Sequence, residues 1–238
     1  MENKSVHILQ VIPNLNLGGA EKFLTDLSNE LSQIGHKITI LTFYKVKTDN
    51  ILVNNLNSNI NFIFLNKKKG FDYKLIFSLK RKINQINPDI IHTHLRSLNY
   101  VFLANFNKLK IVHTVHNEAS KEVDNNLEKF FRKIIFILFK VYPVTISNKS
   151  NESFNDYYKS SFIKSKLILN GSSNPELSKN SNKVKKTLID LRDEFGKDLK
   201  VLVNIGRIEE QKNHILLSRA IKKINKLGLN VAVVVLGC

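Results

Sequence analysis

The sequence predicts a doubly wound α/β fold, in which helices cover both faces of a parallel β-sheet. Short runs of apolar and β-branched residues alternate along the chain with longer amphipathic stretches. Most of the short runs are apolar at consecutive positions, as strands buried on both faces must be. The longer stretches can form the helices that join neighbouring parallel strands by right-handed crossovers.

Each expected strand is an apolar run bounded by polar residues or turn formers. In chain order, the expected strands are Val6–Ile12, Lys37–Phe43, Asn61–Leu65, Asp89–His94, Lys110–His116, Val144–Ser147, Lys166–Leu169, Val201–Gly206 and Val231–Leu236.

Helical periodicity is clearest after the first and third strands. The apolar positions Leu24, Leu27, Leu31 and Ile34 share one helix face, and so do Leu75, Leu79, Ile83 and Ile86. Gly35 is placed to end the first helix in a left-handed conformation, and Pro88 stops the second. Two more helices are expected at Val184–Phe195 and Asn213–Leu227.

A change in composition near Gly171 divides the chain. Residues 172–182 are rich in turn formers and indicate a linker between a first domain, residues 1–171, and a second segment, residues 183–238. A doubly wound domain usually takes about 100 residues or more. The second segment is therefore expected to be the incomplete start of a second Rossmann-like domain. Its last strand, Val231–Leu236, would then expose an apolar face and an edge suited to self-association.

The composition excludes several classes of protein. No unbroken apolar run is longer than Ile134–Phe139, which is far shorter than the roughly 17–25 residues of a membrane span. The only cysteine is Cys238, so the chain cannot form an internal disulfide, and a reducing, cytoplasmic location is expected.

The 37 basic and 20 acidic residues give a net charge of +17, which allows two interpretations. It could mark a surface for nucleic acid or anionic lipid, or it could follow from a composition rich in Lys, Asn and Ile. The lysines are spread along the chain, and aromatic residues do not interleave with them as single-strand binding requires. We therefore expect no nucleic-acid partner. The segment Leu127–Val141 could lie on an anionic membrane surface or be a core helix.

Three motifs carry candidate chemistry. Gly18 and Gly19 lie between the first strand and the first helix, where backbone N–H groups can approach an anion. His92 and His94 share one strand face, and His116 follows the next strand, at the edge where open α/β sheets bind ligands. Three histidines could bind zinc, but no acidic or cysteine partner has ligand spacing, so no metal site is expected.

The third motif follows the strand Val201–Gly206. Gly206 ends this strand, Arg207 follows it directly, and Lys212 precedes the next helix. A guanidinium and an ammonium group would then lie beside a helix N-terminus, as the stabilisation of a departing diphosphate requires. Two ordinary basic residues in a solvated turn would give the same pattern.

The ordered set of these pieces resembles glycosyltransferase family 4, a family of retaining enzymes with the GT-B fold of two Rossmann-like domains. The matching pieces are Gly18-Gly19-Ala20-Glu21, Asp89–His94, His113–Asn117, Ile146-Ser147, Leu169–Gly171, and Gly206-Arg207 with Lys212.

The resemblance implies hexose transfer from a nucleotide sugar to a glycan or lipid-linked acceptor, in bacterial polysaccharide or glycoconjugate synthesis. It implies that Gly206, Arg207 and Lys212 hold the donor diphosphate, that Gly18 and Gly19 approach it, and that His116 lies at the reacting sugar. No cofactor or metal is implied. The second-domain motif of two glutamates eight positions apart does not occur within the 238 residues, so this chain is expected to be inactive alone.

Three other functions are compatible with the sequence: an inactive remnant of such an enzyme, a sugar-nucleotide epimerase on the same fold, and a basic nucleic-acid-binding protein. The transferase is expected to be cytoplasmic, with possible peripheral contact at the cytoplasmic face of an anionic membrane.

Overall fold

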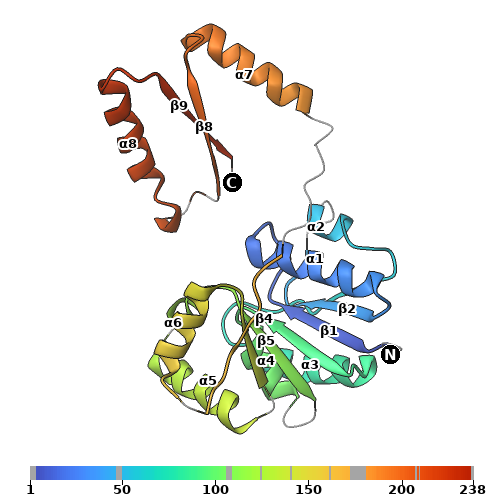
Figure 1. The fold of residues 1–238 in the computed structure, drawn as a ribbon. Coiled ribbons are helices and arrows are strands. Elements are labelled where there is room, and N and C mark those ends of the chain that lie inside the picture. Colours follow the sequence, from blue (N-terminus) through green and yellow to red (C-terminus); the bar gives the residue numbers. More distant parts are fainter. Residues whose placement is uncertain are drawn as a thin grey trace. The chain divides into compact units, whose positions relative to one another are not determined.

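The computed structural model describes residues 4–46, 50–105, 109–123, 125–139, 141–160, 162–171, 181–206, 208 and 210–236. The chain divides into two compact units, Met1–Ser173 and Asn174–Cys238, and each is described by itself (Figure 1).

The first unit is built on a seven-stranded parallel sheet of order β3-β2-β1-β4-β5-β6-β7. The strands are β1 (His7–Ile12), β2 (Lys37–Thr42), β3 (Asn61–Phe64), β4 (Ile90–His94), β5 (Lys110–Val115), β6 (Val141–Thr145) and β7 (Lys166–Leu167). The chain runs outward from β1 to β3, returns to β4 and then runs outward in the other direction. Such a reversal leaves a crevice at the carboxyl ends of β1 and β4. The predicted doubly wound α/β fold is confirmed.

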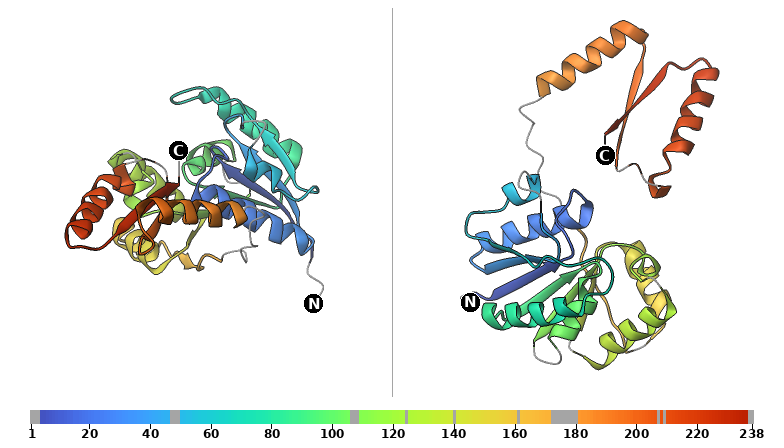
Figure 2. Two further views of the ribbon diagram at one scale, coloured as in Figure 1. Left: turned by 90° about the horizontal axis from the view of Figure 1, so that it is seen from above. Right: turned by 180° about the vertical axis from the view of Figure 1, so that it is seen from behind.

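Helices cover both faces of this sheet (Figures 1 and 2). They are α1 (Gly19–Gln33), α2 (Ile51–Asn54), α3 (Tyr73–Ile86), α4 (Ser97–Ala104), α5 (Asn126–Leu138) and α6 (Asn148–Tyr158), with a 3₁₀ turn, η1 (Ala119–Lys121). Two hydrophobic clusters show the layering. Ile8 and Ile12 of β1 pack with α1 and α2, whereas Leu9 and Val11 pack with α3 to α6.

The ends of the helices follow from their sequences. Gly35, with φ of 95°, comes two residues after the end of α1, as expected. Asn87 adopts a left-handed conformation at the end of α3, directly before Pro88. Asn125 starts α5 because its side-chain oxygen accepts a hydrogen bond from the Glu128 N–H at 2.9 Å.

Strand β6 begins three residues earlier than predicted and includes Pro143. β7 pairs only with Val144 and Thr145, so the first part of β6 is a sheet edge, where a proline is tolerated. The strand ends at Thr145 because Ser147 and Ser150 form a capping box that starts α6.

Helix α5 contributes one face to the core, in agreement with one of the two alternatives that the sequence left open. Its side chains Arg132, Ile135 and Phe136 are buried against the core, whereas Leu127 and Phe130 are exposed. The segment is a core helix on one face and an apolar surface on the other. None of the described helices is long and apolar enough to cross a membrane.

The second unit contains α7 (Ser181–Phe195), β8 (Lys200–Ile205), the 3₁₀ turn η2 (Glu210–Lys212), α8 (His214–Lys226) and β9 (Val231–Leu236). β8 and β9 form a parallel pair joined through α8. Apolar side chains of both strands are exposed, among them Ile205 and Leu236. Most of the predicted linker, residues 172–180, lies outside the described residues.

Candidate functional site

Three histidines gather at the carboxyl ends of β4 and β5. Alternation along β4 places His92 and His94 on one face with ring centroids 4.2 Å apart, as predicted. His94 is hydrogen-bonded through Nε2 to Gln10 Oε1 at 2.8 Å and through Nδ1 to His116 Nε2 at 2.9 Å. His92 Nε2 lies 2.7 Å from Thr114 Oγ1. Neighbouring parallel strands thus supply a connected polar chain that ends at His116.

All three rings are neutral near pH 7. Burial is the main cause, and the neighbouring histidines add to it: the pKa of His94 falls well below its ordinary value, that of His92 falls to about 3 and that of His116 to about 4. A neutral His94 that donates from Nε2 to the Gln10 oxygen must accept at Nδ1 from the His116 Nε2–H. His116 Nδ1 therefore carries a lone pair that can accept a hydrogen bond from a hydroxyl group.

The predicted glycine turn adjoins His116 through helix α1. Gly18 is the N-cap residue of α1 in an extended conformation, and Gly19 is its first residue. A Cβ atom on Gly18 would meet the Glu21 carboxylate, whereas one on Gly19 would meet no atom within 4 Å. Phe23, one turn into α1, packs edge-on against the His116 ring, with the two ring centroids 5.3 Å apart. The structure therefore places the glycine turn and His116 at the same edge of the sheet.

The loop that carries His116 is fixed by Glu122. Its Oε1 accepts hydrogen bonds from the backbone N–H groups of His116 at 2.8 Å and Asn117 at 3.3 Å. Its Oε2 lies 3.5 Å from His113 Nε2 and 3.7 Å from Arg132 Nη1. Burial acts to raise the pKa of Glu122, but His113, Arg132 and the backbone N–H of His116 outweigh it and hold this pKa below its usual value. The carboxylate is therefore charged and locks the loop.

Arg132 connects this lock to α4. Its Nε lies 3.2 Å from Glu128 Oε1, which also accepts a hydrogen bond from Asn99 Nδ2 at 2.7 Å. The Arg132 side chain is only 1% exposed. A buried guanidinium between two carboxylates thus joins α5 to the loop after β5 and, through Glu128, to α4.

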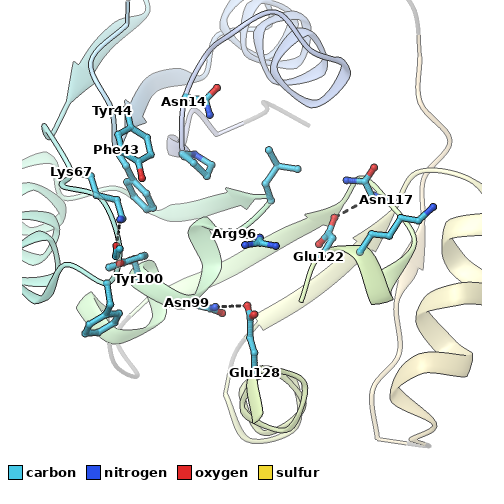
Figure 3. A pocket seen from close by; sticks show the side chains of 15 residues that line it. Asn14, Phe43, Tyr44, Lys67, Arg96, Asn99, Tyr100, Asn117, Glu122 and Glu128 are labelled. Carbon is cyan, nitrogen blue, oxygen red and sulfur yellow. Dashed lines mark hydrogen bonds between the residues drawn. The ribbon is translucent and has the colours of Figure 1, made fainter. Parts of the chain in front are cut away.

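A cavity of about 680 Å³ opens beside this loop (Figure 3). The side chains that line it come from segments that follow the carboxyl ends of β1, β2, β3, β4 and β5. Arg96 lies in the middle, between the Tyr44 and Lys67 side and the Glu122 and Asn117 side. His116 contacts Phe23, whereas the next residue along the chain, Asn117, lines the cavity.

The turn after β4 gives the cavity its wall. Leu95 has a φ of 54°, which is uncommon for a residue with a bulky side chain. Ser97 holds the turn, because its hydroxyl accepts a hydrogen bond from the His94 N–H at 3.1 Å and lies 2.9 Å from the Val11 carbonyl oxygen. This turn lets Leu95 and Arg96 line the cavity. Such local strain is often found at functional sites.

Cationic and aromatic groups share the wall. Lys67, Arg96 and Lys121 are cationic, and Lys67 Nζ lies 5.4 Å from the Tyr100 ring centroid. The two carboxylates of the wall, Glu122 and Glu128, are those that pair with Arg132. The cavity therefore suits a polar ligand with hydroxyl groups or an anionic group.

The predicted phosphate-binding residues of the second unit are described in part. The Lys212 side chain lies over Gly206, where a Cβ atom would come within 3.2 Å of Lys212 Cε. This places Lys212 beside the carboxyl end of β8, as expected. Arg207 lies outside the described residues.

The described part of the chain contains no group of three His, Cys, Asp or Glu side chains arranged to hold a metal ion. The histidine rings bond to one another and to Gln10 and Thr114 instead.

Sequence reasoning did not identify Glu122, Arg132, Arg96 or Asn99. A signal for Arg132 was present, because it lies on the apolar face of α5 and four residues after Glu128, a spacing that brings opposite charges together. Arg96 and Asn99 follow directly after β4, at the strand edge where ligands bind. Glu122 gave no signal, because its partners depend on how the loop after β5 folds.

Residues 17–171 match Glycosyltransferase Family 4. A comparison with curated proteins finds no match.

Solved structures show the same fold. The Anabaena protein HepE, in complex with UDP and glucose, is 16% identical with a TM-score of 0.72, over 97% of this chain and 60% of HepE. A glycosyltransferase from Rickettsia africae is 19% identical with a TM-score of 0.68, over 98% of this chain and 69% of that one. UDP-N-acetylglucosamine 2-epimerase from Rickettsia bellii is less similar: 15% identity and a TM-score of 0.53, over 97% of this chain and 62% of that one. The chain thus spans 60% of the length of HepE.

Proposed function

The chain belongs to glycosyltransferase family 4, and from this we propose that it transfers a hexose from a nucleotide sugar to a glycan or lipid-linked acceptor, with retention at the anomeric carbon. The observation that carries the proposal is the cavity beside the His116 loop, at the carboxyl ends of the central strands. The proposed setting is bacterial polysaccharide or glycoconjugate synthesis in the cytoplasm.

The cavity is the proposed acceptor site. Asn99, Asn117 and Tyr100 can exchange hydrogen bonds with sugar hydroxyl groups, and Tyr44 and Tyr100 offer apolar ring faces. Lys67, Arg96 and Lys121 can hold an anionic group on the same molecule. The chemistry of these lining residues supports an acceptor that carries both hydroxyl groups and an anionic group.

The donor diphosphate is proposed to bind to Gly206, Arg207 and Lys212, with Gly18 and Gly19 approaching it. The two cationic groups would stabilise the charge that develops on the leaving oxygen, a role for which fixed donors are well suited. The nucleotide sugar is a co-substrate, and the proposal includes no metal. UDP-glucose is the first donor to test, because HepE, which has the same fold, binds UDP and glucose.

His116 is proposed to orient the transferred sugar. Its Nδ1 lone pair can accept a hydrogen bond from a sugar hydroxyl, because His94 holds the proton of His116 on Nε2. Gln10 fixes His94 in turn, so the three side chains set one orientation of the His116 ring. The neutral state, which follows from burial, is required for this role.

A labelled donor separates transfer from the epimerase alternative, which the likeness to UDP-N-acetylglucosamine 2-epimerase keeps in view. Extracts of source cells with and without the gene would receive UDP-[¹⁴C]glucose, together with a membrane lipid fraction or without it. We expect gene-dependent label in the lipid or glycan fraction only when the acceptor fraction is present. Gene-dependent conversion of the labelled sugar to an epimer without any acceptor would contradict transfer and favour the epimerase.

A further inference from the structure

A second, apolar hollow adjoins the cavity beside the His116 loop. It has a volume of about 640 Å³ and lies between α4 and α5. Its apolar lining comes from Phe71, Leu103, Leu127, Phe130, Phe131 and Ile134. This hollow, called the α4–α5 groove below, is far less polar than the first cavity.

The groove and the cavity are continuous. Phe71, Asn99, Tyr100 and Glu128 line both of them. The hydrogen bond from Asn99 to Glu128, drawn in Figure 3, joins two residues that line both hollows. The Phe71 ring stacks on the Tyr100 ring, with the two ring centroids 5.8 Å apart. This stacked pair extends the apolar wall from one hollow to the other. A single ligand can therefore occupy both.

The apolar side chains of the groove are unusually exposed. Leu127 is 77% exposed, Phe71 74% and Phe130 63%. Isolated exposed apolar residues are common, but a contiguous set at the mouth of a binding cavity indicates an apolar ligand or partner. The cationic side chains nearby, Lys67, Arg96 and Lys121, belong to the cavity end only.

We propose that the acceptor is an anionic amphiphile: its phosphate-bearing head occupies the cavity and its single hydrocarbon chain lies in the α4–α5 groove. The polar, cationic half of the combined site matches the head, and the apolar half matches the chain. The inference rests on the proposed transferase function, because it names the class of acceptor for the same site. It also accounts for the exposed face of α5, which the core does not use.

A series of alkyl phosphates tests the proposal with the purified chain. Inorganic phosphate, butyl phosphate and octyl phosphate would be titrated by calorimetry below the micelle concentration. We expect octyl phosphate to bind at least about tenfold more tightly than butyl phosphate, because each methylene that enters the groove leaves water. Equal affinities for the two alkyl phosphates would overturn the proposal.

Two pairs of variants locate the binding. The double change Leu127→Asn with Phe130→Asn should abolish the gain in affinity with chain length, whereas Leu138→Asn, also exposed on α5 but outside the groove, should retain it.

Lys121→Gln should weaken the binding of both alkyl phosphates by the same factor, and Lys149→Gln should not. These lysines form a matched pair, because each lies 3.1 Å from Glu118 and only Lys121 lines the cavity. An equal effect of both members of either pair would contradict the assignment.

Vesicles provide the remaining outcome. If the chain binds vesicles containing phosphatidylglycerol through Leu127 and Phe130 but does not bind octyl phosphate, the groove is a membrane-docking surface and the acceptor proposal is wrong. No sugar donor is used in these titrations. If binding depends on chain length but no gene-dependent sugar transfer is seen, the proposed transferase function is wrong and the assignment of the α4–α5 groove still holds. If sugar transfer depends on the gene but binding does not depend on chain length, only the assignment of the groove is wrong.

Discussion

Glu122 and Arg132 are almost fully buried, with 4% and 1% of their side chains exposed. Such charges are tolerated only when they are paired, because an isolated ion loses its hydration inside a protein. Here the Glu122 carboxylate has a second task, since it accepts the backbone N–H groups of the His116 loop. The ion pair and the candidate site therefore depend on one another.

Arg132→Met should lower the free energy of unfolding by about 3–5 kcal/mol, because it leaves the buried Glu122 and the partly buried Glu128 without their cation. Lys133→Met, the neighbouring change on α5, should stay within about 0.5 kcal/mol of the wild type. Urea unfolding monitored by circular dichroism measures both. Similar losses in the two variants would mean that the buried pairs do not stabilise the fold.

The histidines predict a stability that depends on pH. Burial lowers the pKa of His116 to about 4 and of His92 to about 3, whereas both are near 6.5 in the unfolded chain. Between these values the unfolded chain binds more protons, so the free energy of unfolding falls as the pH drops from about 6.5 towards 4. Urea unfolding across this range should show the fall, and His92→Asn should make it shallower. Parallel curves for wild type and variant would contradict the assignment.

At this scale the sequence predicted some residues and missed others. His92 and His94 could be predicted to share a face, because alternation is a local property of a strand. The partners of His94 and His116 could not, because Gln10 reaches His94 through strand register and Glu122 reaches the His116 backbone through loop folding, which no local pattern records.

At the scale of elements, the strands of the central sheet were predicted closely because their burial on both faces leaves long apolar runs. Helices α4 and α6 were harder to predict from the sequence. α4 is short and apolar around much of its circumference, and α6 has few apolar residues, so neither shows strong helical periodicity. The start of α6 depends on the Ser147 and Ser150 capping box rather than on apolar spacing.

Gly35 allows a direct test of how α1 ends. Gly35→Ala should destabilise the protein by about 1–2 kcal/mol, because its φ of 95° is unfavourable for a residue with a Cβ atom. Gly35→Asn should cost less, since asparagine tolerates the left-handed region better. Thermal unfolding compares the two. If alanine were tolerated as well as asparagine, the left-handed conformation would not be what ends the helix.

At the scale of the whole molecule, the doubly wound topology of the seven-stranded sheet agrees with the order of strands and helices expected from the sequence. The convergence of Lys212 and Arg207 with the glycine turn stays a prediction.

The second unit leads to a prediction about association. Val235 and Leu236 of β9 are 43% and 51% exposed, and an exposed apolar strand tends to pair with another copy. We propose that the chain self-associates through Val231–Leu236. Light scattering should give a mass above that of a monomer, and Val235→Lys with Leu236→Lys should return it to a monomer. Leu227→Lys, exposed after α8, is the control. A monomeric wild-type chain at high concentration would refute the proposal.

The most direct test of the central claim is the glycan composition of the source cell, measured by mass spectrometry. Deletion of the gene should remove one hexose from a glycan or glycolipid, and the wild-type gene should restore it. His116→Ala and Lys212→Ala should fail to restore it, whereas Lys226→Ala, a change at the end of α8, should succeed. Unchanged glycans after deletion, or full restoration by His116→Ala, would contradict a sugar transferase that acts at the His116 loop.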